Sequence, residues 1–288
     1  MKARSVIIRL IEHPITPYIL LLFFTVVMVS PIFLIFLNSF KGSAETFAWP
    51  PTIFPKQFTL EAYIRVINSP IPMNLRNSTI LALSTTVIVL LIAVPSAYGI
   101  SKYPFKGSKV LMLAYLASRI VPPLSLLIPF YILFSQLKLL NTLAALVIVN
   151  TYMCFPLVVW MLKGFFDEFP QELIDAALID GCSRIGTMFR VVIPVSMTAI
   201  AAAGIITFLW TWNEFIYAII LTSSKEVFPM TVGIFYFVGD EVIEWNSLSA
   251  VAIFTSLPAI VFFVLFQKYI IEGLVKGAIK MSRLRKEG

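Results

Sequence analysis

Long apolar stretches alternate with shorter polar segments along almost the whole chain. Each stretch is close to, or longer than, the ~20 residues that an α-helix needs to cross the hydrocarbon core of a bilayer. The pattern therefore predicts an all-α, polytopic membrane protein with six transmembrane helices. The predicted spans are residues 17–37, 77–100, 111–134, 142–162, 195–221 and 249–266.

The polar segments divide what we predict to be a single transmembrane domain, residues 1–288. A basic flank comes before the first span, a long connection follows it, and a polar loop is inserted after the fourth span. The parts are the flank 1–16, the first span 17–37, the five-span core 72–270, the inserted loop 163–190 and the tail 267–288.

Prolines concentrate in the third predicted span, at Pro122, Pro123 and Pro129. Proline inside a span is tolerated where neighbouring helices or a cavity satisfy the freed carbonyl groups. The concentration indicates kinked helices around a pathway. Simple packing within a bundle explains it nearly as well, and both interpretations stay open.

The inserted loop has the signals of two short helices joined by a sharp bend. Pro170 suits the first position of a helix, and Glu172 adds favourable negative charge near that end. Gly181 can adopt the left-handed conformation that ends a helix, and Ser183 can cap the next one. The loop therefore predicts a two-helix elbow outside the bilayer with an apolar face. The residues expected on that face are Ile174, Ala177, Leu178, Ile185, Met188 and Phe189.

Composition supports the membrane interpretation. The chain is 59% hydrophobic and 13% charged, with a mean hydropathy of +0.92, whereas soluble domains carry about 25% charged residues. The net charge of +7 raises the possibility of a nucleic-acid partner. However, the basic residues gather at the chain ends and in short loops, 15 on one side of the predicted spans against 6 on the other. This asymmetry excludes nucleic acid and places both termini and the elbow on the cytoplasmic side.

Residues for hydrolytic or metal chemistry are scarce. The two cysteines, Cys154 and Cys182, give no disulfide framework, and one histidine, His13, gives no zinc cluster. Residues 181–187 imitate the spacing of a phosphate-binding loop, but Thr187 stands where lysine must be. We therefore expect no catalytic residue, no metal site and no cofactor bound by this chain.

The elbow has a spacing that resembles a known family. Asp175, Ala176 and Ala177 are followed after three residues by Gly181, and after nine more by the run Val191-Val192-Ile193-Pro194. This resembles the cytoplasmic "EAA" loop of ABC-importer permeases, with Asp175 where the family usually has Glu. Trp212-Asn213-Glu214-Phe215 and residues 267–278 resemble the carbohydrate-importer branch, which includes the second permease subunit of maltose-type systems.

The resemblance implies a type I ABC-importer permease fold and a permease subunit of an ATP-driven, binding-protein-dependent importer of sugars or oligosaccharides. In that family the elbow docks in a cleft of a separate ATPase and passes its closure to the membrane bundle. The alternative is a surface helix that only caps the bundle. The implied coupling residues are Asp175, Ala176, Ala177, Asp180, Gly181 and Pro194.

The same resemblance implies the partners. They are a second permease subunit in a heterodimer, a dimer of ATP-binding-cassette subunits and an extracytoplasmic solute-binding protein. ATP and magnesium belong to the partner ATPase, so this chain is not itself an enzyme. The expected location is the cytoplasmic (inner) membrane of a bacterium or archaeon, with lipid contact for the basic tail.

Two charged residues, Arg119 and Glu214, fall within apolar stretches. A charge near the bilayer centre costs ~2.5–3.5 kcal/mol, so such residues usually face the protein interior or water. We therefore take Arg119, Asn213 and Glu214 as candidate pathway residues. Arg119 in the pathway would favour an acidic sugar, and the alternative is an arginine that snorkels or is ion-paired near the interface. For Glu214 a structural or gating role is favoured over substrate binding.

The predicted external loop, residues 222–246, mixes aromatic residues with acids that include Asp240 and Glu241. Aromatic rings stack on sugar faces, and in similar importers this loop reaches toward the binding protein. Phe235, Tyr236 and Trp245 are therefore candidate contacts. An aromatic belt at the membrane interface explains them equally well.

Three other functions compete. A permease for another solute class, such as a polyol phosphate or amino acid, differs only in the carbohydrate-type segments. A stand-alone secondary carrier predicts several intramembrane charges and an internal repeat, and the sequence has two such charges and no repeat. An intramembrane enzyme predicts a cluster of catalytic side chains inside the spans.

Overall fold

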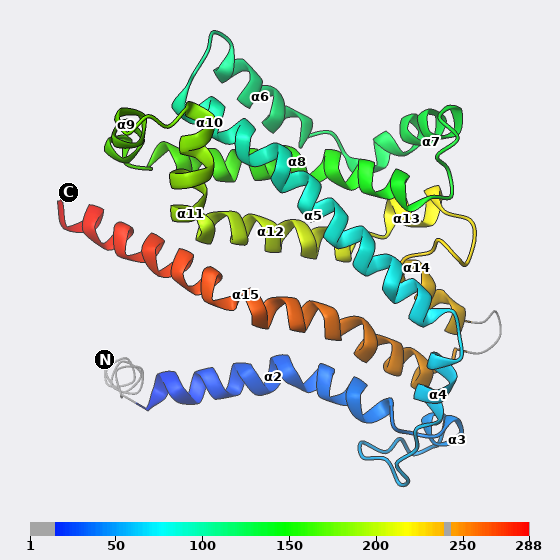
Figure 1. Ribbon diagram of the computed structural model, residues 1–288. Coiled ribbons are helices and arrows are strands. Elements are labelled where there is room, and N and C mark those ends of the chain that lie inside the picture. The colour runs from blue at the N-terminus through cyan, green and yellow to red at the C-terminus, as the bar shows by residue number, and fades with distance from the viewer. Residues whose placement is uncertain (1–14, 239–242, 288) are drawn as a thin grey trace, which may run out of the picture. The chain divides into compact units, whose positions relative to one another are not determined.

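The computed structural model describes residues 15–238 and 243–287, with side chains as far as Gln267. Within these residues every regular element is a helix, apart from an isolated antiparallel bridge between Val238 and Ile243. The all-α prediction is confirmed (Figure 1). Most of the predicted flank 1–16, with His13, and the predicted loop residues Asp240 and Glu241 lie outside the described residues.

Four helices of the described chain are long and apolar enough to cross a membrane. Two bent helix pairs pass the same test when each pair is counted as one span, which gives up to six. The multi-span prediction is therefore confirmed. The count reaches the predicted six only when each bent pair is taken as one span. The four long helices are α2 (Thr16–Asn38), α5 (Ile71–Lys102), α8 (Leu143–Asp167) and the part Trp245–Gln267 of α15 (Trp245–Glu287).

The predicted third span, residues 111–134, is broken rather than continuous. α6 (Ser108–Ser118) and the following helical segment, η1 (Pro123–Leu126) with α7 (Leu127–Gln136), are bent by 96°. Pro122 lies in the break with an extended backbone, φ −60° and ψ 131°. Proline donates no amide hydrogen and disfavours helical geometry in the residue before it, so the proline pair ends α6.

The predicted fifth span, residues 195–221, is also divided. α12 (Met197–Trp212) is followed by three non-helical residues and then by α13 (Ile216–Leu221). At its other end, α12 is bent by 80° from the helical segment Arg184–Val195. Asn213 and Glu214 form a polar interruption at the break between α12 and α13. Because apolar residues lie on both sides of it, a hydropathy average over the whole stretch does not show where α12 ends.

The chain forms two compact units. The first combines Met1–Ser69 with Ile234–Phe254. It contains α2, short helices from the connection after the first span and from the predicted external loop, and the start of α15. An ion pair and a hydrogen bond join the two segments of this unit. Arg65 Nη1 lies 2.7 Å from Glu244 Oε2, and the side-chain amide of Asn246 donates to the Lys41 carbonyl at 3.2 Å. The short helices are α3 (Ser43–Thr46), α4 (Glu61–Ile67) and η3 (Ile234–Phe237).

The second unit combines Pro70–Gly233 with Thr255–Gly288. α5 and α8 pack along each other, and Ala93 and Ala97 of α5 are fully buried beside Val159 of α8. Small side chains let two helices approach closely in a membrane protein. The helices of this unit not yet given are α9 (Gln171–Ile179), α10 (Arg184–Thr187), η2 (Met188–Val192), α11 (Ile193–Val195) and α14 (Met230–Gly233).

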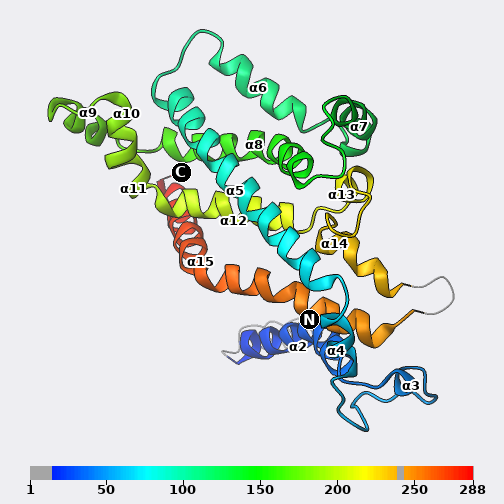
Figure 2. The same ribbon diagram turned by 45° about the vertical axis from the view of Figure 1, so that its right-hand side comes forward.

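Figures 1 and 2 show α9 and α10 at one end of α5 and α8, with α7 and α13 at the other end of α8 and α14 at the other end of α5. The two regions singled out by the sequence, the elbow and the charged segment around Glu214, are therefore separated by the length of the buried helices. α15 continues through Glu287, so helix also covers most of the predicted tail 267–288.

Candidate functional site

The base of the elbow is fixed to two membrane helices. At the end of α8, the Asp167 carboxylate accepts a hydrogen bond from the Ser101 hydroxyl at 2.6 Å and pairs with Lys163 Nζ at 2.6 Å. Beside it, Lys102 Nζ donates to the Phe169 carbonyl at 2.8 Å. Because Ser101 and Lys102 belong to the last turn of α5, the elbow is tied to both α5 and α8.

α9 forms as the sequence predicts, with two differences. Pro170 is the N-cap rather than the first helical residue, and Glu172 lies in the first turn. Ile174 and Ala177 are buried, so they are the anchoring face of the helix. Leu178, predicted on the same face, is exposed, because the unit covers only a narrow stripe of this short helix.

Gly181 ends α9 in the left-handed conformation, with φ +86°. The Cys182 amide donates to the Ala177 carbonyl at 3.0 Å, and the Gly181 amide donates to the Leu178 carbonyl at 3.1 Å. This pair of bonds is the Schellman motif, in which a left-handed residue satisfies the last carbonyls of a helix. The predicted bend at Gly181 is confirmed.

The second half of the elbow begins with the predicted cap. The Ser183 hydroxyl accepts a hydrogen bond from the Gly186 amide at 3.1 Å. Met188 is buried, whereas Ile185 and Phe189 are 69% and 61% exposed. All three nevertheless line one cavity of about 680 Å³. The prediction that they share one side of the elbow is therefore confirmed, although only Met188 is covered by neighbouring side chains.

Pro194 is the second residue of α11, the short helix that follows the π-helix η2. A proline there leaves one carbonyl of the preceding turn without its usual amide partner, which suits a locally widened helix. Of the other predicted coupling residues, Asp175, Ala176, Asp180 and Gly181 are exposed, and Ala177 is buried. The elbow therefore presents acidic and small residues outward, together with exposed apolar residues such as Ile179, which is 86% exposed.

The other predicted site lies around Trp210, near the end of α12. A cavity of about 680 Å³ is lined by Trp210 with Asn213 and Glu214. A second cavity, of about 230 Å³, is lined by Trp210 with Arg119 and Tyr152. Pro123 and Met153 line both cavities. The fold thus brings all three predicted pathway residues to two neighbouring cavities that share one aromatic ring.

Arg119 lies at the break after α6 rather than inside a helix. Its Nη1 donates to the Met153 carbonyl at 2.8 Å, and its guanidinium lies 5.0 Å from the centroid of the Trp210 ring. A cation over the face of a tryptophan is attracted by the ring. Arg119 therefore has a fixed position beside the cavity, with an exposed side chain.

Glu214 has a structural role in the described chain. Its carboxylate accepts hydrogen bonds from the Tyr217 and Ala218 amides, at 2.7 and 3.1 Å, and so satisfies the first amides of α13. Its own carbonyl accepts a hydrogen bond from the Thr231 hydroxyl at 2.7 Å. Asn213 donates to the Leu209 carbonyl at 2.8 Å one turn earlier. These bonds hold the break between α12 and α13 in one geometry.

Sequence reasoning did not select Trp210, Tyr152 or Met153. A signal was present for Trp210, because it stands three residues before Asn213 and therefore on the same helix face. Tyr152 and Met153 belong to α8, far away in sequence, and only packing brings them to the cavity. The predicted binding-protein contacts lie in the first unit, where Phe235 and Trp245 are exposed and Tyr236 is partly buried.

Comparisons with known proteins give a consistent picture. The sequence pattern of the family described as "Binding-protein-dependent transport system inner membrane component" matches residues 89–276. The chain is 33% identical over 251 residues to the "Sulfoquinovosyl glycerol transport system permease protein SmoH" of Agrobacterium fabrum, covering 87% of this chain and 88% of the relative. It is 34% identical over 239 residues to the "Trehalose/maltose transport system permease protein MalG" of Thermococcus litoralis, covering 82% and 86%.

Among solved structures, one chain of a bacterial ABC transporter involved in the import of the acidic polysaccharide alginate superimposes with a TM-score of 0.78. The match covers 88% of this chain and 95% of that chain, at 21% sequence identity. At this identity the likeness shows a shared fold.

Proposed function

Since the chain belongs to the family of binding-protein-dependent transport system inner membrane components, we propose that it is a transmembrane subunit of an ATP-driven importer for a sugar or oligosaccharide. Its transport cycle is alternating access, and the energy comes from ATP bound with magnesium in a partner ATPase. The chain contributes half of the translocation pathway, and a second permease subunit contributes the rest.

The observation that carries the proposal is the construction of the elbow. The segment with the family's coupling spacing is a helix–turn–helix whose bend is fixed by Gly181 and whose base is bonded to α5 and α8. A force applied to α9 is therefore passed to two membrane helices rather than absorbed by a loose loop. Asp175, Ala176, Asp180 and Gly181 are the contacts that we assign to the ATPase. Ala177 and Pro194 hold the elbow in shape.

The cavities around Trp210 support a sugar as the solute. Small-molecule sites are concave and mostly apolar, with a few polar groups that fix orientation, and here Asn213 and Arg119 supply such groups beside an aromatic ring. Two relatives are named as permeases for sulfoquinovosyl glycerol and for trehalose/maltose. Their names support a sugar as the substrate class. An extracytoplasmic binding protein delivers the solute, with Phe235, Tyr236 and Trp245 as its candidate contacts.

The test is transport by the complete importer in liposomes. The chain is reconstituted with the second permease subunit, the ATPase and the binding protein encoded beside it. Uptake is then measured for neutral oligosaccharides, acidic oligosaccharides, a polyol phosphate and an amino acid. We expect uptake of a sugar by those importers whose ATPase lies inside the liposomes. This uptake should require ATP inside the liposomes and the binding protein outside them.

Uptake by the permease subunits without ATPase would contradict the proposal and favour a secondary carrier. ATP-driven uptake limited to the amino acid or the polyol phosphate would retain the importer and overturn the sugar assignment. The two parts of the proposal are therefore tested separately in one experiment.

A further inference from the structure

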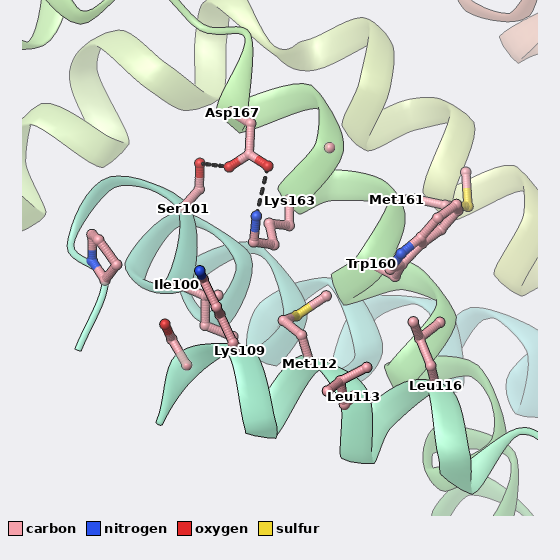
Figure 3. A pocket seen from close by; sticks show the side chains of 13 residues that line it. Ile100, Ser101, Lys109, Met112, Leu113, Leu116, Trp160, Met161, Lys163 and Asp167 are labelled. Atoms are coloured by element: carbon pink, nitrogen blue, oxygen red, sulfur yellow. Dashed lines mark hydrogen bonds and ion pairs between the residues drawn. The ribbon is translucent and has the colours of Figure 1, made fainter. Parts of the chain in front are cut away.

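A further cavity lies near the elbow, away from the cavities around Trp210. It has a volume of about 670 Å³ and is bounded by the end of α5, one side of α6 along its length and the last turns of α8. Figure 3 shows its two ends. Ser101, Lys109, Lys163 and Asp167 lie at one end, and Leu116, Trp160 and Met161 lie at the other. The cavity is therefore polar at one end and apolar at the other.

The charges at the polar end do not balance. Lys163 and Asp167 pair with each other, and the Asp167 carboxylate also accepts the Ser101 hydrogen bond. Lys109 is exposed and makes no hydrogen bond or ion pair within the part of the chain that the structure describes. The lining of the cavity thus has one positive charge without a counterion.

The backbone adds to this positive end. Lys109 is the second residue of α6, which begins at the left-handed Gly107 without a side-chain cap or an acidic residue in its first turn. The first amides of a helix point outward and carry the positive end of its dipole. A lysine at that position is unfavourable unless an anion is bound nearby. The Ser108 amide is bonded to the Phe105 carbonyl, so the free amides of the first turn and Lys109 place the positive charge at this end of the cavity.

The apolar end suits an acyl chain. Leu113 and Trp160 line the cavity and are 65% and 50% exposed, and Leu116 is also exposed. Trp160 belongs to the membrane-spanning helix α8. Tryptophan is enriched where hydrocarbon meets headgroups, because its ring is apolar with one polar N–H. An anion that also has a hydrocarbon chain fits both ends of the cavity.

We propose that this cavity binds an anionic phospholipid of the leaflet on the elbow side. The phosphate pairs with Lys109 and the first turn of α6, and an acyl chain lies against Leu113, Leu116 and Trp160. Ser101 and Asp167 face the headgroup, and their bonds to each other and to Lys163 keep this wall of the cavity neutral. The proposal depends on the chain's place in a membrane and not on the transported solute.

The experiment measures quenching of Trp160 fluorescence by brominated lipids. The full chain is placed in nanodiscs that contain brominated phosphatidylglycerol or brominated phosphatidylethanolamine, and the Trp160→Phe variant gives the Trp160 contribution by difference. We expect stronger quenching by the anionic lipid. Lys109→Gln should lower this preference about fivefold, the factor that one lysine near an anionic surface contributes. Lys109→Arg should keep it.

Lys106 provides the matched control. It is an exposed lysine in the same connection, three residues earlier, and it does not line the cavity. Lys106→Gln should therefore keep the preference for phosphatidylglycerol. An equal loss in both glutamine variants would mean general attraction to a charged surface and would overturn the site.

Two further results would also overturn the proposal. The first is absence of quenching by any brominated lipid, which would mean that protein covers the cavity. The second is full displacement of the anionic lipid by soluble glycerol 3-phosphate at millimolar concentration, which would mean a phosphate site without a lipid tail. Incomplete displacement, with the preference retained, supports the acyl-chain contact.

Discussion

At the scale of single residues, the sites are held by backbone geometry more than by charge. Gly181 has φ +86°, and its amide donates a hydrogen bond to the Leu178 carbonyl. Glu214 is bonded to two backbone amides of α13. Arg119 is held by one carbonyl and one aromatic face. Each residue lies at a break or bend in a helix and helps to fix its geometry.

Gly181→Pro should uncouple transport from ATP hydrolysis. Proline fixes φ near −65° and removes the amide hydrogen, so the Schellman bend cannot form. The substitution adds ~1–3 kcal/mol of local strain. Because this strain disturbs the elbow, we expect ATP-driven uptake to fall by about tenfold or more. The complex should still assemble. Gly99→Ala is the control, because no atom lies within 4 Å of the added Cβ and α5 is helical there. Normal uptake by Gly181→Pro would contradict the coupling role of the elbow.

Arg119→Gln should affect acidic and neutral oligosaccharides differently. The variant keeps a hydrogen-bond donor near the Met153 carbonyl but removes the positive charge beside Trp210. An exposed charge pair contributes ~0.2–1 kcal/mol, so uptake of an acidic oligosaccharide should fall by up to about fivefold relative to a neutral one. Trp210→Ala should lower uptake of both. An equal effect of Arg119→Gln on the two substrates would show that Arg119 has only a structural role.

At the scale of elements, the short helices of the first unit depend on side-chain bonds rather than on a large core. α4 is joined to the start of α15 by Arg65 and Glu244. Burial raises the pKa of Glu244, but hydrogen bonds from Ser247 and Arg65 outweigh it and hold that pKa below its usual value. The hydrogen bond with Glu244 raises the pKa of Arg65, so the arginine stays charged at all working pH values.

This pair predicts a local acid transition. A carboxyl group whose pKa is lowered in the folded state stabilises it above the ordinary pKa, and the contribution is lost as pH falls through the lowered value. The link between α4 and α15 should therefore weaken below about pH 4. The measurement is the fluorescence of Trp245 as a function of pH, obtained by subtracting the signal of the Trp245→Phe variant. A change in this difference reports the weakening of the link. Glu244→Gln should remove the transition and Glu61→Gln should keep it, so a transition of unchanged size in Glu244→Gln would contradict the assignment.

At the scale of the whole molecule, orientation decides whether the elbow can meet an ATPase. The basic residues predict that the elbow faces the cytoplasm. The two native cysteines allow a direct test, because Cys182 is partly exposed in the elbow and Cys154 is buried in α8. A membrane-impermeant maleimide should label one cysteine per chain in inside-out vesicles and none in right-side-out vesicles.

Cys182→Ser is the control for this labelling and should abolish it, because buried Cys154 remains. Labelling of the wild-type chain in right-side-out vesicles would place the elbow on the outer face. That result would exclude contact with a cytoplasmic ATPase, whatever the similarity of the sequence.

Local features of the structure were accessible from the sequence. The long apolar stretches, the bend at Gly181, the cap at Ser183 and the disturbance at Pro122 and Pro123 all depend on a few adjacent residues. Helix length, left-handed φ, capping and proline geometry act within one or two turns, and their outcome does not need the rest of the fold.

Only the tertiary structure decided which side of each helix is covered. In a membrane protein the residues that face lipid and those that face other helices are both apolar, so hydropathy does not separate them. The burial of Met188 between exposed Ile185 and Phe189, and the meeting of Arg119 with Trp210, depend on helices distant in sequence. The sequence by itself determined the helices and the elbow, while packing between distant segments determined the cavities.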